Sequence, residues 1–417
     1  MDYQARVYYG GEHCRDPSPF AQYKRPDWRT RRHVEQQPVS IVAVFGTRPE
    51  IIKLAPVFHA LGDDARIRTN LVSTGQQRDL LPVFLDDFGI RIDESLGTMV
   101  PGRSLNESLA TMITALDGVF ARTAANLVVV QGDTSTALAG ALAARFRSIP
   151  VAHVEAGLRT GNPDRPFPEE SNRTLISRIA SLHFAPTAGN RENLIAEGVP
   201  RSSIIVSGNP VIDALVAIEA KKPSSEQLTE LLTRFDGQKL VVLTIHRREN
   251  FGPRLGAYIE VVREFLDRHP DCAVVVPVHP NPMAHDPVIA GFAGVARVAL
   301  IDPLPYADFI GLLRNAWLVL SDSGGIQEEV VTLGTPLLIL RTETERPEAV
   351  ASGIARLAAT APALATELET AIAPGSWLET VSPHDNPFGD GHSGSRIARA
   401  ISDFVRGQVS TISGDCA

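Results

Sequence analysis

Cysteine is scarce in this sequence, and the three that occur, Cys14, Cys272 and Cys416, lie far apart. Their spacing fits neither a disulfide framework nor a zinc site. No apolar run approaches the roughly 20 residues that span a bilayer, and no apolar segment of signal-peptide type begins the sequence. These absences predict a protein of the reducing cytoplasm that has no membrane partner.

Positive charge is also in short supply, since 40 lysines and arginines face 48 aspartates and glutamates and give a net charge of −8. That balance argues against a nucleic-acid partner. The 417 residues, 44% hydrophobic and 21% charged, have the composition of an ordinary soluble globular protein. A chain of this length holds two or three domains if a domain has about 100–200 residues.

Short apolar runs alternate with helical segments along most of the chain. The predicted strands are residues 41–45, 70–74, 126–130, 149–152, 203–207, 240–244, 273–278, 298–301, 317–320 and 336–340. Such alternation indicates parallel sheets covered by helices on both faces. We therefore predict an α/β fold with two Rossmann-like, doubly wound domains that enclose a central cleft.

The predicted boundaries follow from this pattern. Residues 1–38 are rich in Arg, Pro, Tyr and Gln without a hydrophobic period, and we interpret them as a flexible extension. Residues 39–208 form the N-terminal domain and residues 209–392 the C-terminal domain. A closing helix over about residues 393–409 is expected to pack back onto the N-terminal domain.

An unusually polar segment, HVEAGLRTGNPDRPFPEESNR, runs from His153 to Arg173 after the strand predicted over residues 149–152. Loops at the carboxyl ends of parallel strands carry the chemistry of open α/β sheets. Asp133 follows another such strand, so it is expected to lie near Glu155 and Glu169. Clustered carboxylates raise one another's pKa, which suits general acid or base catalysis. A solvated connection with surface ion pairs is the alternative.

Two strand-to-helix turns favour anion binding, because helix starts expose N–H groups and the positive end of the helix dipole. The turn from Gly46 to Glu50 adds Arg48 and, one helical turn later, Lys53. A second turn, SGG at residues 323–325, lets a diphosphate approach the backbone closely. Glu329, further along that helix, is placed for ribose hydroxyls. Plain capped helices packed by glycines would also account for both turns.

Histidines end two strands of the second half. His246 and Arg247 follow the strand predicted over residues 240–244, and a phosphate contact is plausible for His246. His279, in PVHPNP, is a weaker case of the same kind. Ordinary surface histidines are the alternative.

Ten segments in order carry a resemblance to one family. They read FGTRPEIIKLAP, QGDTSTAL, HVEAGLRTG, PFPEESNR, GNPVIDAL, HRRENFG, PVHPNP, DSGGIQEE, TERPEAV and NPFGDG. With them, the body of the chain resembles the non-hydrolysing UDP-N-acetylglucosamine 2-epimerases. The resemblance implies a glycosyltransferase-B-like fold and interconversion of UDP-GlcNAc and UDP-ManNAc through a 2-acetamidoglucal, without metal or other cofactor. It also implies a cytoplasmic homodimer in cell-surface polysaccharide biosynthesis.

The same motif matches imply roles for individual residues. Proton transfer and catalysis are implied for Asp133, Glu155, Glu169 and His246. Substrate contacts are implied for Arg48, Lys53, Phe309, Ser323, Gly324, Gly325, Glu329 and Arg346. A second, allosteric UDP-GlcNAc is implied near Gln76, Arg103, Arg247 and His279. Three alternatives stay open: a hydrolysing epimerase that releases ManNAc and UDP, a glycosyltransferase of the same fold that uses a UDP-sugar, and a sugar-nucleotide-binding protein without activity.

Overall fold

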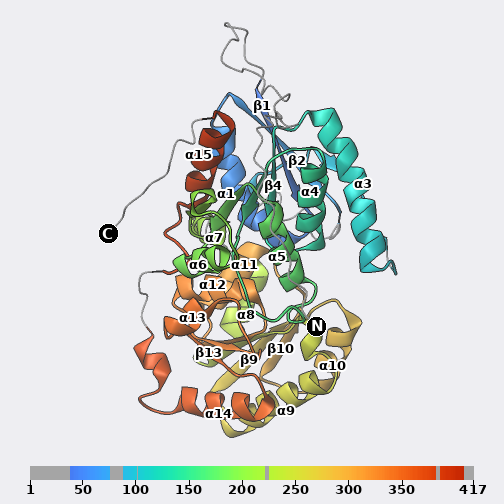
Figure 1. Cartoon of the computed structure of the whole chain (residues 1–417). Coiled ribbons are helices and arrows are strands. Elements are labelled where there is room, and N and C mark those ends of the chain that lie inside the picture. The colour runs from blue at the N-terminus through green and yellow to red at the C-terminus, as the bar shows by residue number, and fades with distance from the viewer. Residues whose placement is uncertain (1–37, 76–87, 101, 221–224, 382–385, 408–417) are drawn as a thin grey trace, which may run out of the picture. The chain divides into compact units, whose positions relative to one another are not determined.

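The computed structural model describes residues 38–75, 88–100, 102–220, 225–381 and 386–407. Within these ranges the chain forms two parallel β-sheets, each flanked by helices (Figure 1). Among the described residues no helix is long and apolar enough to cross a membrane. The predicted extension over residues 1–38 falls almost wholly outside the described part of the chain.

The first sheet has seven strands in the order β3-β2-β1-β4-β5-β6-β7. Their bounds are Val39–Phe45 (β1), Ile67–Ser73 (β2), Glu94–Ser95 (β3), Leu127–Gln131 (β4), Val151–Val154 (β5), Leu182–Ala185 (β6) and Ile204–Val206 (β7). Alternate residues of β1 explain why both faces are covered. Ile41 and Phe45 join one apolar cluster with the helices α1 (Arg48–Gly62) and α15 (Ser393–Val405), whereas Val42 and Val44 join another with α3 (Leu105–Thr123) and α4 (Ser135–Phe146).

The second sheet has six strands in the order β10-β9-β8-β11-β12-β13. Their bounds are Lys239–Thr244 (β8), Cys272–Pro277 (β9), Val298–Ile301 (β10), Leu318–Ser321 (β11), Leu337–Ile339 (β12) and Ala355–Leu357 (β13). The same alternation recurs in β8, where Leu240 and Val242 face one apolar cluster and Val241 and Leu243 face the other.

The remaining helices connect these strands. They are α5 (Glu169–Ile179), α6 (Ala188–Ala196), α7 (Pro210–Glu219), α8 (Glu226–Arg234), α9 (Pro253–Arg268), α10 (Pro282–Phe292), α11 (Tyr306–Arg314), α12 (Gly324–Leu333), α13 (Pro347–Ala351) and α14 (Ala361–Ile372). The closing helix α15 packs against α1, and the two lie side by side in Figure 1. A Cβ atom on Gly394 would lie 2.7 Å from the backbone of Pro56, so the approach depends on glycine.

The strand predicted over residues 149–152 lies two residues further along the chain, in β5. Ile149 N donates to Ala144 O at the end of α4 (2.9 Å), and Pro150 has no N–H, so the sheet ladder starts at Val151. Consequently Glu155 directly follows the strand. The short strands β3, β6 and β13 belong to no predicted strand.

Candidate active site

The candidate site gathers at the carboxyl ends of β1, β4 and β5, with contributions from the second sheet. Glu155 is the residue after β5 and has a left-handed backbone, with φ of 65°. This conformation is uncommon for a residue other than glycine, and such residues concentrate at functional sites. It turns the chain sharply at the strand end and leaves the Glu155 side chain buried, 5% exposed.

Four side chains bind the Glu155 carboxylate. Lys53 from α1 and Gln131 from β4 make short hydrogen bonds to it. Asn209 Nδ2 donates to Oε1 at 2.9 Å, and an Arg346 guanidinium nitrogen lies 3.1 Å from the same oxygen. Burial alone would raise the pKa of Glu155, but Lys53 and Arg346 outweigh it and hold the pKa at about 2. Glu155 is therefore ionised at neutral pH.

Arg346 connects three buried carboxylates. Its Nε donates to Glu328 at 2.6 Å, and two guanidinium nitrogens bond Glu345 at 2.7 Å and Glu155 at 3.1 Å. Burial would lower the pKa of Arg346, but these three acids raise it above the ordinary value. Because Glu155 follows a strand of the first sheet and Glu328 lies in α12, the cluster joins residues of both halves of the chain.

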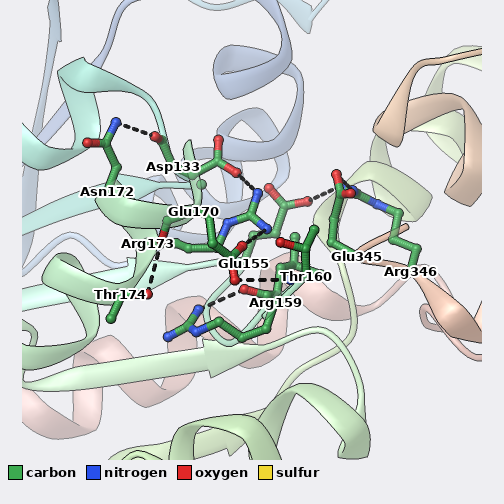
Figure 2. A network of polar contacts seen from close by, with 12 residues as sticks. Asp133, Glu155, Arg159, Thr160, Glu170, Asn172, Arg173, Thr174, Glu345 and Arg346 are labelled. Carbon is green, nitrogen blue, oxygen red and sulfur yellow. Dashed lines mark hydrogen bonds and ion pairs between the residues drawn. The ribbon is translucent and has the colours of Figure 1, made fainter. Parts of the chain in front are cut away.

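A second ion-pair group surrounds Asp133, as Figure 2 shows. Arg173 makes a short ion pair with Asp133 and binds Glu170 at 3.0 Å. Asn172 Nδ2 donates to the Asp133 carbonyl oxygen at 2.8 Å. Glu170 also accepts from the backbone N–H groups of Thr160 and Gly161, both at 3.0 Å. Glu170 thus fixes the loop, and Arg173 aligns Asp133.

Glu169 is the first residue of α5. Within the described residues its Oε2 atom is buried and has no hydrogen-bond partner. A buried carboxylate oxygen is costly to leave unpaired, so such an atom indicates a place for an incoming group. Its neighbour Glu170, by contrast, has its carboxylate fully engaged.

His153, a residue of β5, supports the turn before Asp133. The ring nitrogen Nε2 lies 2.7 Å from Gly132 O. Burial lowers the pKa of His153 to about 3, so the ring is neutral and Nε2 donates its proton to that carbonyl.

The turn from Gly46 to Glu50 leads into α1. Thr47 caps α1 and forms a capping box with Glu50, whose carboxylate also accepts from Gly46 N at 3.0 Å. Lys53 extends from this helix to Glu155. Burial lowers the pKa of Arg48, while nearby Glu329 acts in the opposite direction. Arg48 and Lys53 therefore face acids of both halves of the chain.

The SGG turn at residues 323–325 begins α12 at Gly324, after its N-cap Ser323. A Cβ atom on Gly324 would lie 2.5 Å from a nitrogen of Arg346, whereas one on Gly325 would meet no atom within 4 Å. Gly325 therefore borders open space at a helix start. Further along α12, Glu329 accepts from the Tyr306 hydroxyl at 2.9 Å.

His246 lies after β8 with its Nδ1 2.9 Å from Asp322. Burial would raise the pKa of Asp322, but His246 and Asn250 lower it to about 2. The rings of His279 and His246 are stacked, and their centroids are 6.4 Å apart. Burial, together with His246 and Arg48, lowers the pKa of His279.

The other predicted residues lie at different distances from this cluster. Arg247 is 3.7 Å from Glu345, at its margin. Phe309 is partly buried against an apolar cluster of the second sheet. Arg103 is exposed before α3 and binds Thr111 at 3.1 Å. Gln76 lies outside the described residues.

The sequence does not predict roles for several polar residues that make these contacts: Gln131, Asn209, Asp322 and Glu345. Asn209 stands in GNPVIDAL and Glu345 in TERPEAV, two motifs that had been singled out. An Asn before Pro at a helix start is a signal for an N-cap, but it does not reveal the partners of the second amide group.

The two parallel sheets, with polar loops at their carboxyl ends, define an α/β protein of Rossmann-like halves. The model of the UDP-N-acetylglucosamine 2-epimerase family matches residues 59–402. The chain therefore belongs to this family and is an epimerase, an isomerase, and the predicted fold class is confirmed.

Individual relatives agree with this assignment. A probable UDP-N-acetylglucosamine 2-epimerase from Ralstonia nicotianae is 42% identical over 370 residues, which cover 87% of this chain and 99% of the relative. The UDP-GlcNAc 2-epimerase from Neisseria meningitidis, solved with UDP-GlcNAc, is 37% identical with a TM-score of 0.84, covering 88% of this chain and 100% of that one. An S. aureus protein, MnaA, solved with UDP, is 34% identical with a TM-score of 0.85, covering 91% and 100%.

Proposed function

We propose that this chain interconverts UDP-GlcNAc and UDP-ManNAc without hydrolysis, by eliminating UDP and adding it back. The buried cluster of Glu155, Lys53 and Arg346 carries the proposal, because it brings a carboxylate and two cations together beside the glycine start of α12. The relatives solved with UDP-GlcNAc and with UDP support the substrate class. A homodimer in the cytoplasm is part of the same proposal.

The chemistry sets three requirements. A base removes the proton on C2 of the sugar, the C1–O bond breaks with its electron pair on the β-phosphate oxygen, and a C1=C2 double bond forms. On return, the same oxygen attacks C1 and an acid delivers a proton to the other face of C2. The site must therefore supply a base, an acid and a firm hold on detached UDP.

We assign proton transfer to Asp133, Glu155 and Glu169. The unpartnered oxygen of Glu169 is free to take or give a proton. Glu155 is a weak base while Lys53 and Arg346 bind it. A diphosphate that draws these cations away would raise the pKa of Glu155 and turn it into a usable base. Substrate binding and the activation of Glu155 would then be one event.

The hold on UDP comes from cations and a helix start. Arg48, Lys53, Arg346 and His246 would surround the diphosphate, and Ser323, Gly324 and Gly325 would offer the backbone N–H groups of α12. Glu329 would accept from the ribose, and Phe309 would lie near the uracil. These roles would account for the buried cations next to a glycine-rich helix start.

A second UDP-GlcNAc, acting as an allosteric activator, is proposed near Gln76, Arg103, Arg247 and His279. The stacking of His279 on His246 and the closeness of Arg247 to Glu345 support a link between this group and the reaction site.

NMR of the products tests the proposal. Purified protein and UDP-GlcNAc should give UDP-ManNAc with the sugar–diphosphate linkage intact. Free ManNAc appearing in step with UDP would instead establish the hydrolysing epimerase. E155Q should lower turnover by about 10²- to 10⁴-fold. The matched control E94Q, which removes an exposed carboxylate paired with Arg122 at 2.6 Å, should retain full turnover.

A further inference from the structure

Asn209 stands where the chain passes from the first sheet to the second. It is fully buried and caps α7, with its Oδ1 accepting from Val211 N at 3.2 Å. Its backbone N–H donates to Phe388 O at 2.6 Å. These two bonds fix both the position of Asn209 and the direction of its amide group.

The other end of the amide reaches two carboxylates. Asn209 Nδ2 donates to Glu155 at 2.9 Å and to Glu328 at 2.8 Å. An amide nitrogen carries two hydrogens, so both are used. The opposite orientation would aim the amide oxygen at two acidic side chains, of which Glu155 is ionised, and is therefore disfavoured.

Arg346 binds the same two carboxylates from another side, at 3.1 Å to Glu155 and 2.6 Å to Glu328. Glu155, Arg346, Glu328 and Asn209 thus form a closed ring of hydrogen bonds. Lys53 and Gln131 also face Glu155, and Glu345 also faces Arg346. Asn209 is the neutral member that ties the two acids together without adding charge.

We propose that Asn209 is a positioning residue of the epimerase reaction. Its two amide N–H groups bind the Glu155 and Glu328 carboxylates to the same nitrogen atom, and so align Glu155 and Arg346 with the substrate. The inference rests on the proposed function. Asn209 acts through Glu155 and Arg346 rather than by touching the sugar nucleotide.

N209S separates this role from helix capping. Serine keeps a side-chain acceptor for the N-cap, but its single short donor does not reach both carboxylates. Loss of a hydrogen bond to a charged group should lower kcat by about 10- to 100-fold. KM for UDP-GlcNAc should stay within about threefold, because the substrate contacts are retained.

N209D, of the same shape, tests the charge. Its ionised carboxylate would face Glu155 and Glu328, whereas its protonated form can donate one hydrogen bond. The loss of kcat should therefore be larger at pH 8 than at pH 6, relative to the wild-type enzyme at each pH. A purely structural role would give the same loss at both. In N209D/E328Q the donor and acceptor are exchanged, so kcat should recover at least about fivefold over N209D.

N386D is the matched control, since Asn386 lies near the same crossover. Its Oδ1 accepts from Phe388 N at 3.0 Å and its Nδ2 donates to the Thr332 hydroxyl at 2.7 Å. N386D should match the wild-type kcat and pH profile within twofold. If the wild type is active and the kcat values of N209S and N209D lie within twofold of its kcat, the role of Asn209 is overturned and the proposed function is not. A wild type without epimerisation would overturn the proposed function instead.

Discussion

Glu155 combines a left-handed backbone with a buried, fully bonded carboxylate. In the proposed function its two cationic partners, Lys53 and Arg346, also bind the diphosphate. Competition between Glu155 and the phosphates for Lys53 and Arg346 would link binding to base strength, since each lost cation raises the pKa of the carboxyl. Adjacent glutamates in α5 offer a sharper test of individual roles.

Glu169 and Glu170 should respond differently to the same change. E169Q removes a carboxylate with a free oxygen, so kcat should fall by at least about 100-fold while the free energy of unfolding changes little. In Glu170 one carboxylate oxygen accepts from two backbone N–H groups and the other accepts from Arg173. E170Q keeps one oxygen acceptor, so one of these two sets of bonds is lost and the free energy of unfolding should fall by about 1–3 kcal/mol. Steady-state kinetics and urea unfolding measure the two effects.

Each variant is the control for the other. Equal loss of stability in both, with similar kcat, would contradict the separate roles of these residues.

At this scale the sequence predicts residue types better than partners. Motif matches and strand ends identify Lys53, Glu155 and Arg346, but not that they bind one another. Lys53 is 102 residues and Arg346 is 191 residues from Glu155 along the chain, so these contacts depend on how distant segments meet in three dimensions. The position of Asn209 before a proline indicates a helix N-cap, but it does not reveal that the amide nitrogen binds Glu155 and Glu328.

Helix α12 begins with two adjacent glycines whose surroundings differ. Gly324 gives room to Arg346, because a methyl group there would press on the guanidinium. Gly325 faces open space, so its methyl group would meet only a ligand. The helix start therefore packs against the ion cluster on one side and is accessible on the other.

G325A should leave the free energy of unfolding within about 0.5 kcal/mol of wild type or raise it slightly, because Ala favours a helix more than Gly. It should nevertheless weaken UDP binding by at least about tenfold, a loss of about 1.4 kcal/mol, if the diphosphate occupies this space. Isothermal titration calorimetry with UDP measures the change.

G324A serves as the comparison, and we expect it to lower kcat through displaced Arg346. Wild-type affinity of G325A for UDP would show that the diphosphate lies elsewhere.

Apolar runs in the sequence predict where most strands lie, but they do not predict the first and last residue of every strand. Val298–Ile301 agrees with its prediction, whereas β5 is displaced because Pro150 lacks an N–H and Ile149 is occupied by α4. The strands β6 (LHFA) and β13 (ARL) each contain a histidine or an arginine, so neither forms a continuous apolar run, and only pairing with a neighbour defines them.

Across the molecule, buried Asp322 ties together separate strand ends of the second sheet. It accepts from the backbone N–H groups of His246 and Arg247 after β8 and from Asn250, which also donates to Leu340 O after β12. Its pKa of about 2 is lower than that of an unfolded aspartate. The ionised form thus stabilises the fold above about pH 4, and this stabilisation is lost as the pH falls through about 2.

D322N should therefore lower the free energy of unfolding at pH 7 by about 2 kcal/mol. The difference from wild type should be present at pH 5 and should narrow below pH 4. Urea unfolding at several pH values measures it. The control D286N breaks an exposed pair with His285 and should change stability by less than about 0.5 kcal/mol. If D322N lowers the free energy of unfolding as little as D286N does, Asp322 does not stabilise the fold by joining these strand ends.

Elimination and re-addition of UDP break the C2–H bond of the sugar, and exchange with deuterium measures that step. Wild-type protein is incubated with UDP-GlcNAc in D₂O, and the recovered UDP-GlcNAc and UDP-ManNAc are analysed by proton NMR. The C2 proton signal should disappear from both sugars, and the E155Q variant should leave it in place. Full retention of the C2 proton in sugar nucleotides that have turned over would contradict elimination and re-addition of UDP at this site.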